Sequence, residues 1–388
     1  MTSLRQIMEL ASRPGVLSFA IGLPGSDLFP REVFARETAR VLTADASCLQ
    51  YGLPYPPLKS QIVGLMAQRG VRCTEEQVFL TSGAQQGIDL LNRLLVEPGG
   101  QILIEWAVYD GIQLAARQRN PEILTVASDL DAGIDVDAVE ALLVNGVRPA
   151  YLYIIPNGHN PLGASLSVEA RQRLAELARR YQMPILEDDA YGFLYYEETP
   201  VPPVRALEDE WVFYLGSFSK ILAPALRAGW IVVPERLTGS LSQLKHAADL
   251  DTPAFSHRMI SAFMEAGHLP AHLEVIRAEY RRRRDAMLAA LQAYFPPEVR
   301  WTRPASGMFI WAELPQGPRS IDTAELLRVA VETESVAFSP GVVFCAGDQK
   351  HGSRCMRLTF SCHPPERIEE GIRRLGRVIR KEMAKSLA

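Results

Sequence analysis

A lysine, two serines and an arginine lie close together around residue 220, and their side chains suggest a common chemistry. The sequence reads Ser217-Phe218-Ser219-Lys220, and Arg227 follows seven residues later. The apolar run at residues 211–215 predicts a buried strand that leads into this turn. A lysine amine can form a Schiff base with an aldehyde, and hydroxyl and guanidinium groups can bind a phosphate. This set of side chains suits a phosphate-bearing aldehyde. Pyridoxal phosphate carries both an aldehyde and a phosphate. Taken alone, the motif is explained better by an exposed Ser/Lys turn than by a cofactor site.

A second candidate phosphate site follows the predicted strand at residues 78–80. Gly83, Ala84 and Gln85 stand between this strand and a predicted amphipathic helix. Small residues let a ligand approach the backbone, and the free N–H groups at a helix N-terminus favour a phosphate. A tight turn without a ligand explains this motif equally well when it is considered alone.

Asp188 ends the predicted strand at residues 184–187, and Tyr191 follows three residues later. A carboxylate beside a pyridine nitrogen keeps that nitrogen protonated and makes the ring a stronger electron sink. Tyr191 can donate to the phenolic oxygen of such a ring. The alternatives are an acidic cluster at a strand end and a divalent metal site formed by residues 187–189. No histidine accompanies these carboxylates at ligand spacing, so we expect no metal.

Asn160 lies in a Pro/Gly turn after the apolar run at residues 151–155. Pro161 biases Asn160 toward an extended conformation, which can aim its amide into a cleft beyond the strand.

The elements that must position these groups alternate between short apolar runs and helical patterns. The predicted strands lie at residues 78–80, 101–105, 123–126, 151–155, 184–187, 211–215 and 230–233. Continuous apolar strands separated by helices predict an α/β fold whose mostly parallel sheet is covered on both faces. Ligands then bind at the carboxyl ends of the strands.

The pattern changes after about residue 270 and predicts a smaller α+β domain. It contains a long charged helix at 272–294, strands at 299–302, 308–313 and 354–360, a helix from 322 and a last apolar-faced helix. The arginines at 281–284 occupy four consecutive helical positions and point all round the helix, so we expect a solvated face rather than a nucleic-acid patch.

Composition limits the partners of the chain. The 388 residues carry a net charge of -4, which gives no general attraction to nucleic acid or to an anionic membrane. Five cysteines without CxxC spacing argue against a disulfide framework and a zinc site. No apolar segment is long enough to span a membrane or act as a signal peptide, and we expect a cytoplasmic protein.

The motifs, taken together and in order, resemble the fold-type I pyridoxal-phosphate aminotransferases of class I/II. Within them the chain looks most like the branch of 2-aminoadipate and kynurenine aminotransferases. The resemblance rests on Tyr51, Gly83-Ala84-Gln85, Tyr109, Asn160-Pro161-x-Gly163, Asp188-x-Ala190-Tyr191, Ser217-x-Ser219-Lys220, Arg227 and Arg357. It covers nearly the whole chain. It implies a large seven-stranded domain at residues 31–275, a small domain at 276–388, and an N-terminal segment at 1–30 that belongs with the small domain and covers the active site.

The resemblance also implies a role for each matching residue. Lys220 would hold the cofactor and move the substrate proton, Asp188 would pair with the pyridine nitrogen, and Asn160 and Tyr191 would bind the 3-oxygen. Tyr109 would stack on the ring. The phosphate ligands would be Gly83, Ala84, Gln85, Ser217, Ser219 and Arg227, with Tyr51 contributed by the other subunit of a homodimer. Arg357 would bind the substrate α-carboxylate, Gly22 would line the pocket, and Arg5 could meet an acidic group at the far end, although a solvated arginine is the simpler expectation.

The predicted activity is transfer of an amino group between an L-amino acid and a 2-oxo acid by a ping-pong mechanism in amino-acid metabolism. The alternatives are the same cofactor with another outcome, namely β-elimination, decarboxylation or racemisation, or a regulator-like effector domain. A protein that only binds the cofactor would lack some of the family's site residues, and all of them are present in this sequence. The loop after Tyr51 looks about two residues shorter than the family pattern, which puts the substrate range in doubt.

Overall fold

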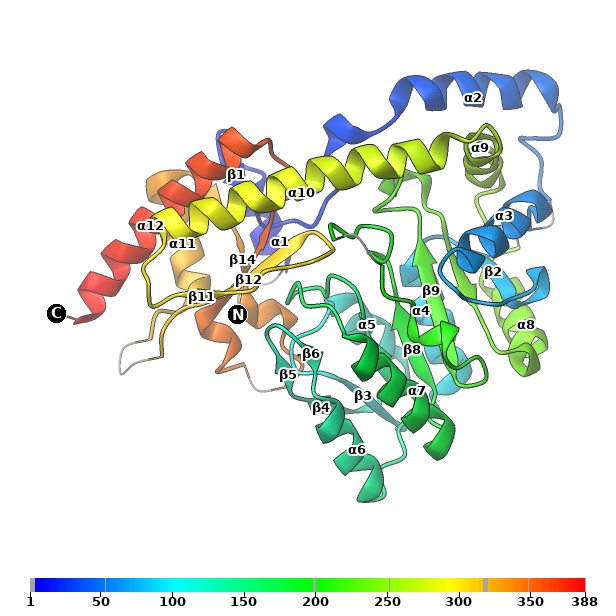
Figure 1. Cartoon of the computed structure of the whole chain (residues 1–388), viewed down its shortest axis with the longest axis horizontal. Helices are drawn as coiled ribbons and strands as arrows, with labels where there is room; N and C mark the ends of the chain where they lie inside the picture. The colour runs from blue at the N-terminus through cyan, green and yellow to red at the C-terminus, as the bar shows by residue number, and fades with distance from the viewer. Residues whose placement is uncertain are drawn as a thin grey trace.

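A seven-stranded sheet forms the centre of the computed structural model, which describes residues 4–52, 54–197, 200–250, 252–316, 320–347 and 349–387 (Figure 1). The strands lie in the order β2 (Val78–Thr81), β10 (Gly229–Val232), β9 (Val212–Ser217), β8 (Ile185–Asp188), β7 (Leu152–Ile154), β3 (Gln101–Glu105) and β4 (Glu122–Val126). Strand β10 is antiparallel to both of its neighbours, β2 and β9, and the other neighbouring strands are parallel. The predicted α/β fold with a mostly parallel sheet is confirmed.

Helices cover both faces of this sheet because alternate residues of each strand point to opposite sides. In β3, Ile102 and Ile104 belong to one apolar cluster and Leu103 to another. The first cluster lies under α4 (Ala84–Leu95) and α5 (Asp110–Ala116), and the second under α6 (Val136–Val144) and α7 (Val168–Tyr181). The continuous apolar runs of the sequence are therefore strands buried on both faces.

Local capping explains where α7 begins and ends. The side chain of Ser167 accepts a hydrogen bond from the Ala170 N–H at the N-terminus. Gln182 then adopts a left-handed conformation with φ of 53° and ends the helix. This ending directs the chain into β8, which carries Asp188.

A second, four-stranded sheet has the order β11 (Arg300–Trp301), β12 (Phe309–Glu313), β15 (Cys355–Thr359) and β14 (Ser339–Pro340). Near it lie α11 (Thr323–Glu334), α12 (Pro365–Leu387) and the long α10 (His268–Tyr294). The N-terminal segment joins this region, because β1 (Leu17–Ser18) pairs with β13 (Val336–Ala337). The predicted domain boundary at 275/276 falls within α10, and the domain limits stay a prediction.

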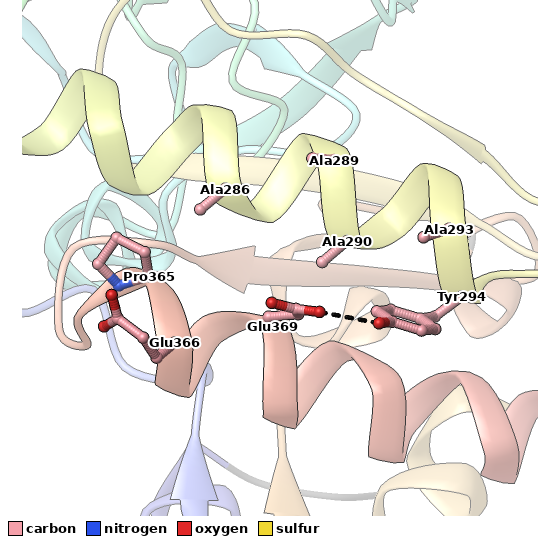
Figure 2. Close-up of a pocket in the computed structure, with 8 residues that line it drawn as sticks. All are labelled: Ala286, Ala289, Ala290, Ala293, Tyr294, Pro365, Glu366 and Glu369. Carbon is pink, nitrogen blue, oxygen red and sulfur yellow. Dashed lines mark hydrogen bonds between the residues drawn. The ribbon is translucent and has the colours of Figure 1, made fainter.

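Small side chains of α10 line a pocket beside the beginning of α12. Figure 2 shows four alanines of α10 facing the beginning of α12, and a hydrogen bond in which the Tyr294 hydroxyl donates to Glu369 Oε1 over 2.8 Å. The remaining helices are α1 (Leu4–Ala11), α2 (Arg31–Ala44), α3 (Pro56–Ala67), α8 (Thr238–Ala248) and α9 (Ala254–Glu265). No helix within the described residues has the length and apolarity needed to cross a membrane.

The expectation of a solvated arginine face on α10 is wrong for two of its four positions. Arg283 is 1% exposed and Arg284 is 8% exposed. Arg283 Nε donates to Glu279 over 2.7 Å, and its other nitrogens contact Asp27 and the Ser361 carbonyl. A buried guanidinium can be accommodated when its donors are satisfied in this way. Arg283 therefore ties α10 to the N-terminal segment and to the end of β15.

Candidate active site

Asp188 lies at the carboxyl end of β8, where one of its oxygens is held and the other is left without a partner. The Tyr153 hydroxyl, from the neighbouring strand β7, donates to Asp188 Oδ2 over 2.7 Å. Asp188 Oδ1 is buried and accepts no hydrogen bond from any residue that the structure describes. Burial raises the pKa of Asp188 to about 6, while the Tyr153 hydrogen bond lowers it. A buried acceptor of this kind is ready for an N–H group of a ligand.

Lys220 follows β9 and reaches the N-terminal segment. Its Nζ donates to the Gly22 carbonyl over 2.8 Å. In the same turn the Ser219 N–H donates to Ser217 Oγ over 3.1 Å, which orders the backbone just before the lysine. Burial lowers the pKa of Lys220 to about 8, and the positive charge of Arg357 acts in the same direction. A larger share of the amine is therefore neutral and nucleophilic near pH 8 than in an ordinary lysine.

The turn between β2 and α4 forms a cradle with Arg227. Gly83 has φ of +82°, and a Cβ atom built there would lie 2.7 Å from Arg227 Nη2, so only glycine fits. Arg227 Nη2 donates to the Ser82 carbonyl over 2.8 Å. Ala84 is the first residue of α4, whose N-terminal N–H groups need acceptors. These donors suit a phosphate.

Arg357 of β15 joins this group of residues from the second sheet. Its Nη1 donates to Asn160 Oδ1 over 2.7 Å and its Nη2 to the Ala20 carbonyl over 2.6 Å. The guanidinium carbon lies 4.3 Å from the ring centre of Phe309 and 4.5 Å from that of Phe344. Burial lowers the pKa of Arg357 to about 10, which keeps it cationic at neutral pH. Such a group can bind a carboxylate as a fork.

Tyr109 and Tyr191 complete the walls of the site. The Tyr109 hydroxyl donates to Gln85 Oε1 over 3.1 Å, and Gln85 Nε2 donates to the Gly111 carbonyl over 2.9 Å. Tyr191 is 5% exposed and stands edge-on to Phe309, with ring centres 5.7 Å apart. Burial raises the pKa of Tyr191 well above its usual range, so the hydroxyl stays protonated and can donate.

The carboxylates on either side of Asp188 have separate structural partners. Glu187 accepts hydrogen bonds from the backbone N–H groups of Val204 and Arg205 over 2.7 and 2.8 Å. Asp189 forms an ion pair with Arg69 over 2.9 Å. The acidic run therefore divides by function: Glu187 and Asp189 anchor the strand ends, and Asp188 alone keeps an unused oxygen.

Comparisons with known proteins agree with this geometry. A family model described as aminotransferase class I and II matches residues 15–375. This chain belongs to that family. The aminotransferase is 38% identical to aromatic-amino-acid aminotransferase 1 of Thermococcus litoralis, with 99% of this chain and 93% of the relative covered. It is also 38% identical to 2-aminoadipate transaminase of Thermus thermophilus, with 99% and 95% covered.

A solved structure supports the same aminotransferase family through its fold. The α-aminoadipate aminotransferase LysN of Thermus thermophilus, complexed with N-(5'-phosphopyridoxyl)-L-leucine, superposes with a TM-score of 0.89. The identity is 37%, and 98% of this chain and 95% of LysN are covered. The predictions of the family, of its 2-aminoadipate/kynurenine branch, of the fold and of aminotransferase activity are confirmed.

One of the predicted site residues, Tyr51, lies apart from the others in the single aminotransferase chain, and a second, Arg5, cannot be placed. Tyr51 is 84% exposed. Arg5 belongs to α1, but its side chain lies outside the part of the chain that the structure describes. Sequence reasoning also missed three residues of the site, namely Tyr153, Phe309 and Phe344. The two phenylalanines lie in apolar runs and resemble any other core residue, whereas Tyr153 at a strand position next to Asp188 could have been found once β7 and β8 were paired.

Proposed function

We propose that this aminotransferase binds pyridoxal phosphate on Lys220 and transfers amino groups between an L-amino acid and a 2-oxo acid by a ping-pong mechanism. The observation that carries the proposal is the buried, unpartnered Oδ1 of Asp188. A protonated ring nitrogen would donate a hydrogen bond to this oxygen. Without a cationic or N–H-bearing ligand, the buried oxygen lacks a hydrogen bond, which costs folding free energy. The lowered pKa of Lys220 supports the same ligand, because an aldehyde reacts with a neutral amine.

The hydrogen-bond donors of the site fit this cofactor. Gly83, Ala84, Ser217, Ser219 and Arg227 would hold the phosphate, since they supply backbone N–H groups, hydroxyls and a guanidinium. Gln85 would contribute through its contact with Tyr109, which would stack on the ring. Asn160 and Tyr191 would bind the 3-oxygen. When bound, the cofactor supplies an electron sink that makes the Cα–H bond of an amino acid acidic.

Two residues of the chain would then act on the substrate. Arg357 would bind the α-carboxylate with both of its terminal nitrogens and so orient the Cα–H bond. Lys220 Nζ would accept the proton from Cα and return it at the other reacting carbon, because burial lowers its pKa and leaves more of the amine neutral. Gly22 would leave room beside them, since a Cβ there would lie 2.6 Å from the Phe309 ring.

We further propose that the active unit is a homodimer in which Tyr51 of each subunit completes the phosphate site of the other. Tyr51 and Leu49 are 84% and 72% exposed in the isolated chain. Two large side chains that leave so much apolar surface in water indicate an interface. Names of relatives point to aromatic amino acids and 2-aminoadipate as the first donors to test.

The experiment that tests the proposed function uses one amino acid at a time with no keto acid present. The holoenzyme should lose its visible cofactor absorption and accumulate pyridoxamine phosphate together with one equivalent of 2-oxo acid. Addition of a second keto acid should restore the original spectrum. A panel of donors that produces ammonia, carbon dioxide or only the D-enantiomer would contradict the proposal.

A further inference from the structure

Side chains hold the backbone at the start of the cradle that the β2–α4 turn forms with Arg227. The Ser82 N–H donates to Gln86 Oε1 over 2.8 Å, and the Ser82 carbonyl accepts from Arg227 Nη2 over 2.8 Å. In the same turn the Thr81 hydroxyl donates to the Gly83 carbonyl over 3.0 Å. Arg227 is a proposed phosphate ligand, whereas Gln86 has no role in the proposed function.

Gln86 is in turn held by a segment that lies far away in the sequence. Its Nε2 donates to Asp249 Oδ2 over 2.8 Å, so both ends of the Gln86 amide have a partner. Asp249 ends α8, and its other carboxylate oxygen forms an ion pair with Lys245. Lys245 Nζ also donates to the hydroxyl of the buried Thr252 over 3.0 Å. These contacts fix the Asp249 carboxylate, and the carboxylate fixes the Gln86 amide.

The direction of these hydrogen bonds suits an anion site. The Asp249 carboxylate has only acceptor oxygens, so it binds the Nε2 end of Gln86 and turns the amide oxygen toward the Ser82 N–H. The proposed phosphate donors Gly83 and Ala84 follow directly in the chain. Donors on a backbone that is already ordered bind a ligand more tightly than donors that must be ordered when the ligand arrives.

We propose that Gln86 and Asp249 are positioning residues that preorganise the N–H groups of Gly83 and Ala84 for the cofactor phosphate. Asp249 acts through Gln86, and Gln86 acts through the Ser82 peptide, so neither side chain needs to touch the cofactor. The inference rests on the proposed function, because it requires pyridoxal phosphate in this cradle. Loss of either side chain should weaken binding of the phosphate group and leave binding of the aldehyde end unchanged.

The test compares how the apoenzyme binds pyridoxal phosphate and pyridoxal, which differ only in the phosphate. Both dissociation constants are measured from the visible absorption of the bound compound. The phosphate preference is the dissociation constant of pyridoxal divided by that of pyridoxal phosphate, and a general loss of folded protein affects both constants alike. Gln86→Leu adds no charge and removes both hydrogen bonds. Its phosphate preference should fall about 10-fold, as expected for the loss of hydrogen bonds that order the donors.

Gln77 provides a matched control, because it makes the same two kinds of hydrogen bond at the opposite end of β2. It accepts from the Thr74 N–H over 3.1 Å and donates to the Val233 carbonyl over 3.0 Å. Gln77→Leu therefore removes as many hydrogen bonds as Gln86→Leu. It should leave the phosphate preference unchanged.

Two substitutions of Asp249 separate positioning from a direct effect of its charge on the phosphate. Asp249→Asn keeps an oxygen that can accept from Gln86, and it should keep most of the phosphate preference. Asp249→Ala removes the acceptor and should lower the preference about 10-fold. A direct charge effect gives the opposite result, because removal of a nearby negative charge favours binding of a phosphate. A preference that rises in Asp249→Ala would overturn the inference.

The remaining outcomes distinguish this inference from the proposed function. An unchanged preference in Gln86→Leu would overturn the inference, and so would equal falls in Gln86→Leu and Gln77→Leu. If Gln86→Leu does not fold, the two Asp249 variants decide, because this side chain is 21% exposed and lies at a helix end. If the wild-type apoenzyme binds pyridoxal as tightly as pyridoxal phosphate, the proposed function itself fails.

Discussion

Replacing Asp188 by Asn should stabilise the protein without cofactor and impair the enzyme with it. The pKa of Asp188 is raised from 3.8 to about 6 because the carboxylate is buried and one of its oxygens has no partner. At about 1.4 kcal/mol for each pKa unit, the ionised carboxylate destabilises the folded apoenzyme by roughly 3 kcal/mol. The folded state binds this proton more tightly than the unfolded state, so the penalty is absent below about pH 3.8 and complete above about pH 6.

Urea unfolding of the two apoproteins between pH 4 and pH 8 measures this difference. Asp188→Asn should gain stability relative to wild type as the pH rises through about 6, up to roughly 3 kcal/mol at pH 8. The same variant should lose about 100-fold or more in kcat/KM, because an amide does not favour a protonated ring nitrogen. An apoprotein that is less stable than wild type at pH 8, or a variant with near-normal turnover, would refute the reasoning and direct attention to Asp189.

Three other experiments test separate parts of the site. Arg357→Lys removes the planar fork and should lower kcat/KM for donor and acceptor alike, by about 10- to 100-fold; an effect on only one of them would exclude a shared carboxylate site. An equal mixture of Lys220→Ala and Tyr51→Ala subunits should regain about a quarter of wild-type activity, since about half of the dimers are mixed and each has one intact site; no recovery after subunit exchange would contradict the composite site. Tyr153→Phe removes the hydrogen bond that lowers the pKa of Asp188, so the acidic limb of the pH–rate profile should move to higher pH; an unchanged profile would leave Tyr153 a packing residue.

The sheet could be predicted from the sequence because its strands are buried on both faces. Each of the seven apolar runs forms one strand of the large sheet, and no boundary differs by more than two residues. The starts of two helices could also be predicted, α7 from Ser167 and α11 from Asp322. In both, a capping side chain accepts from N–H groups two or three residues away. The residues within and next to each element therefore determine the strand positions and these helix starts.

The buried arginine of α10 could not be predicted in the same way. The four arginines at residues 281–284 are equivalent in sequence, and only the tertiary fold decides which of them are buried. Arg283 is buried because Asp27, distant in the sequence, comes beside it. The same limit applies to Tyr153 and Phe344, whose roles depend on which strand or loop lies next to Asp188 and Arg357.

The identity of the lysine that carries the cofactor is the most direct test of the whole account. The holoenzyme is reduced with borohydride, digested, and the labelled peptide is sequenced. We predict that the pyridoxyl group is found on Lys220, and that Lys220→Ala binds the cofactor without covalent attachment and does not turn over. A label on Lys245 or on any other lysine would contradict the assignment of the active site.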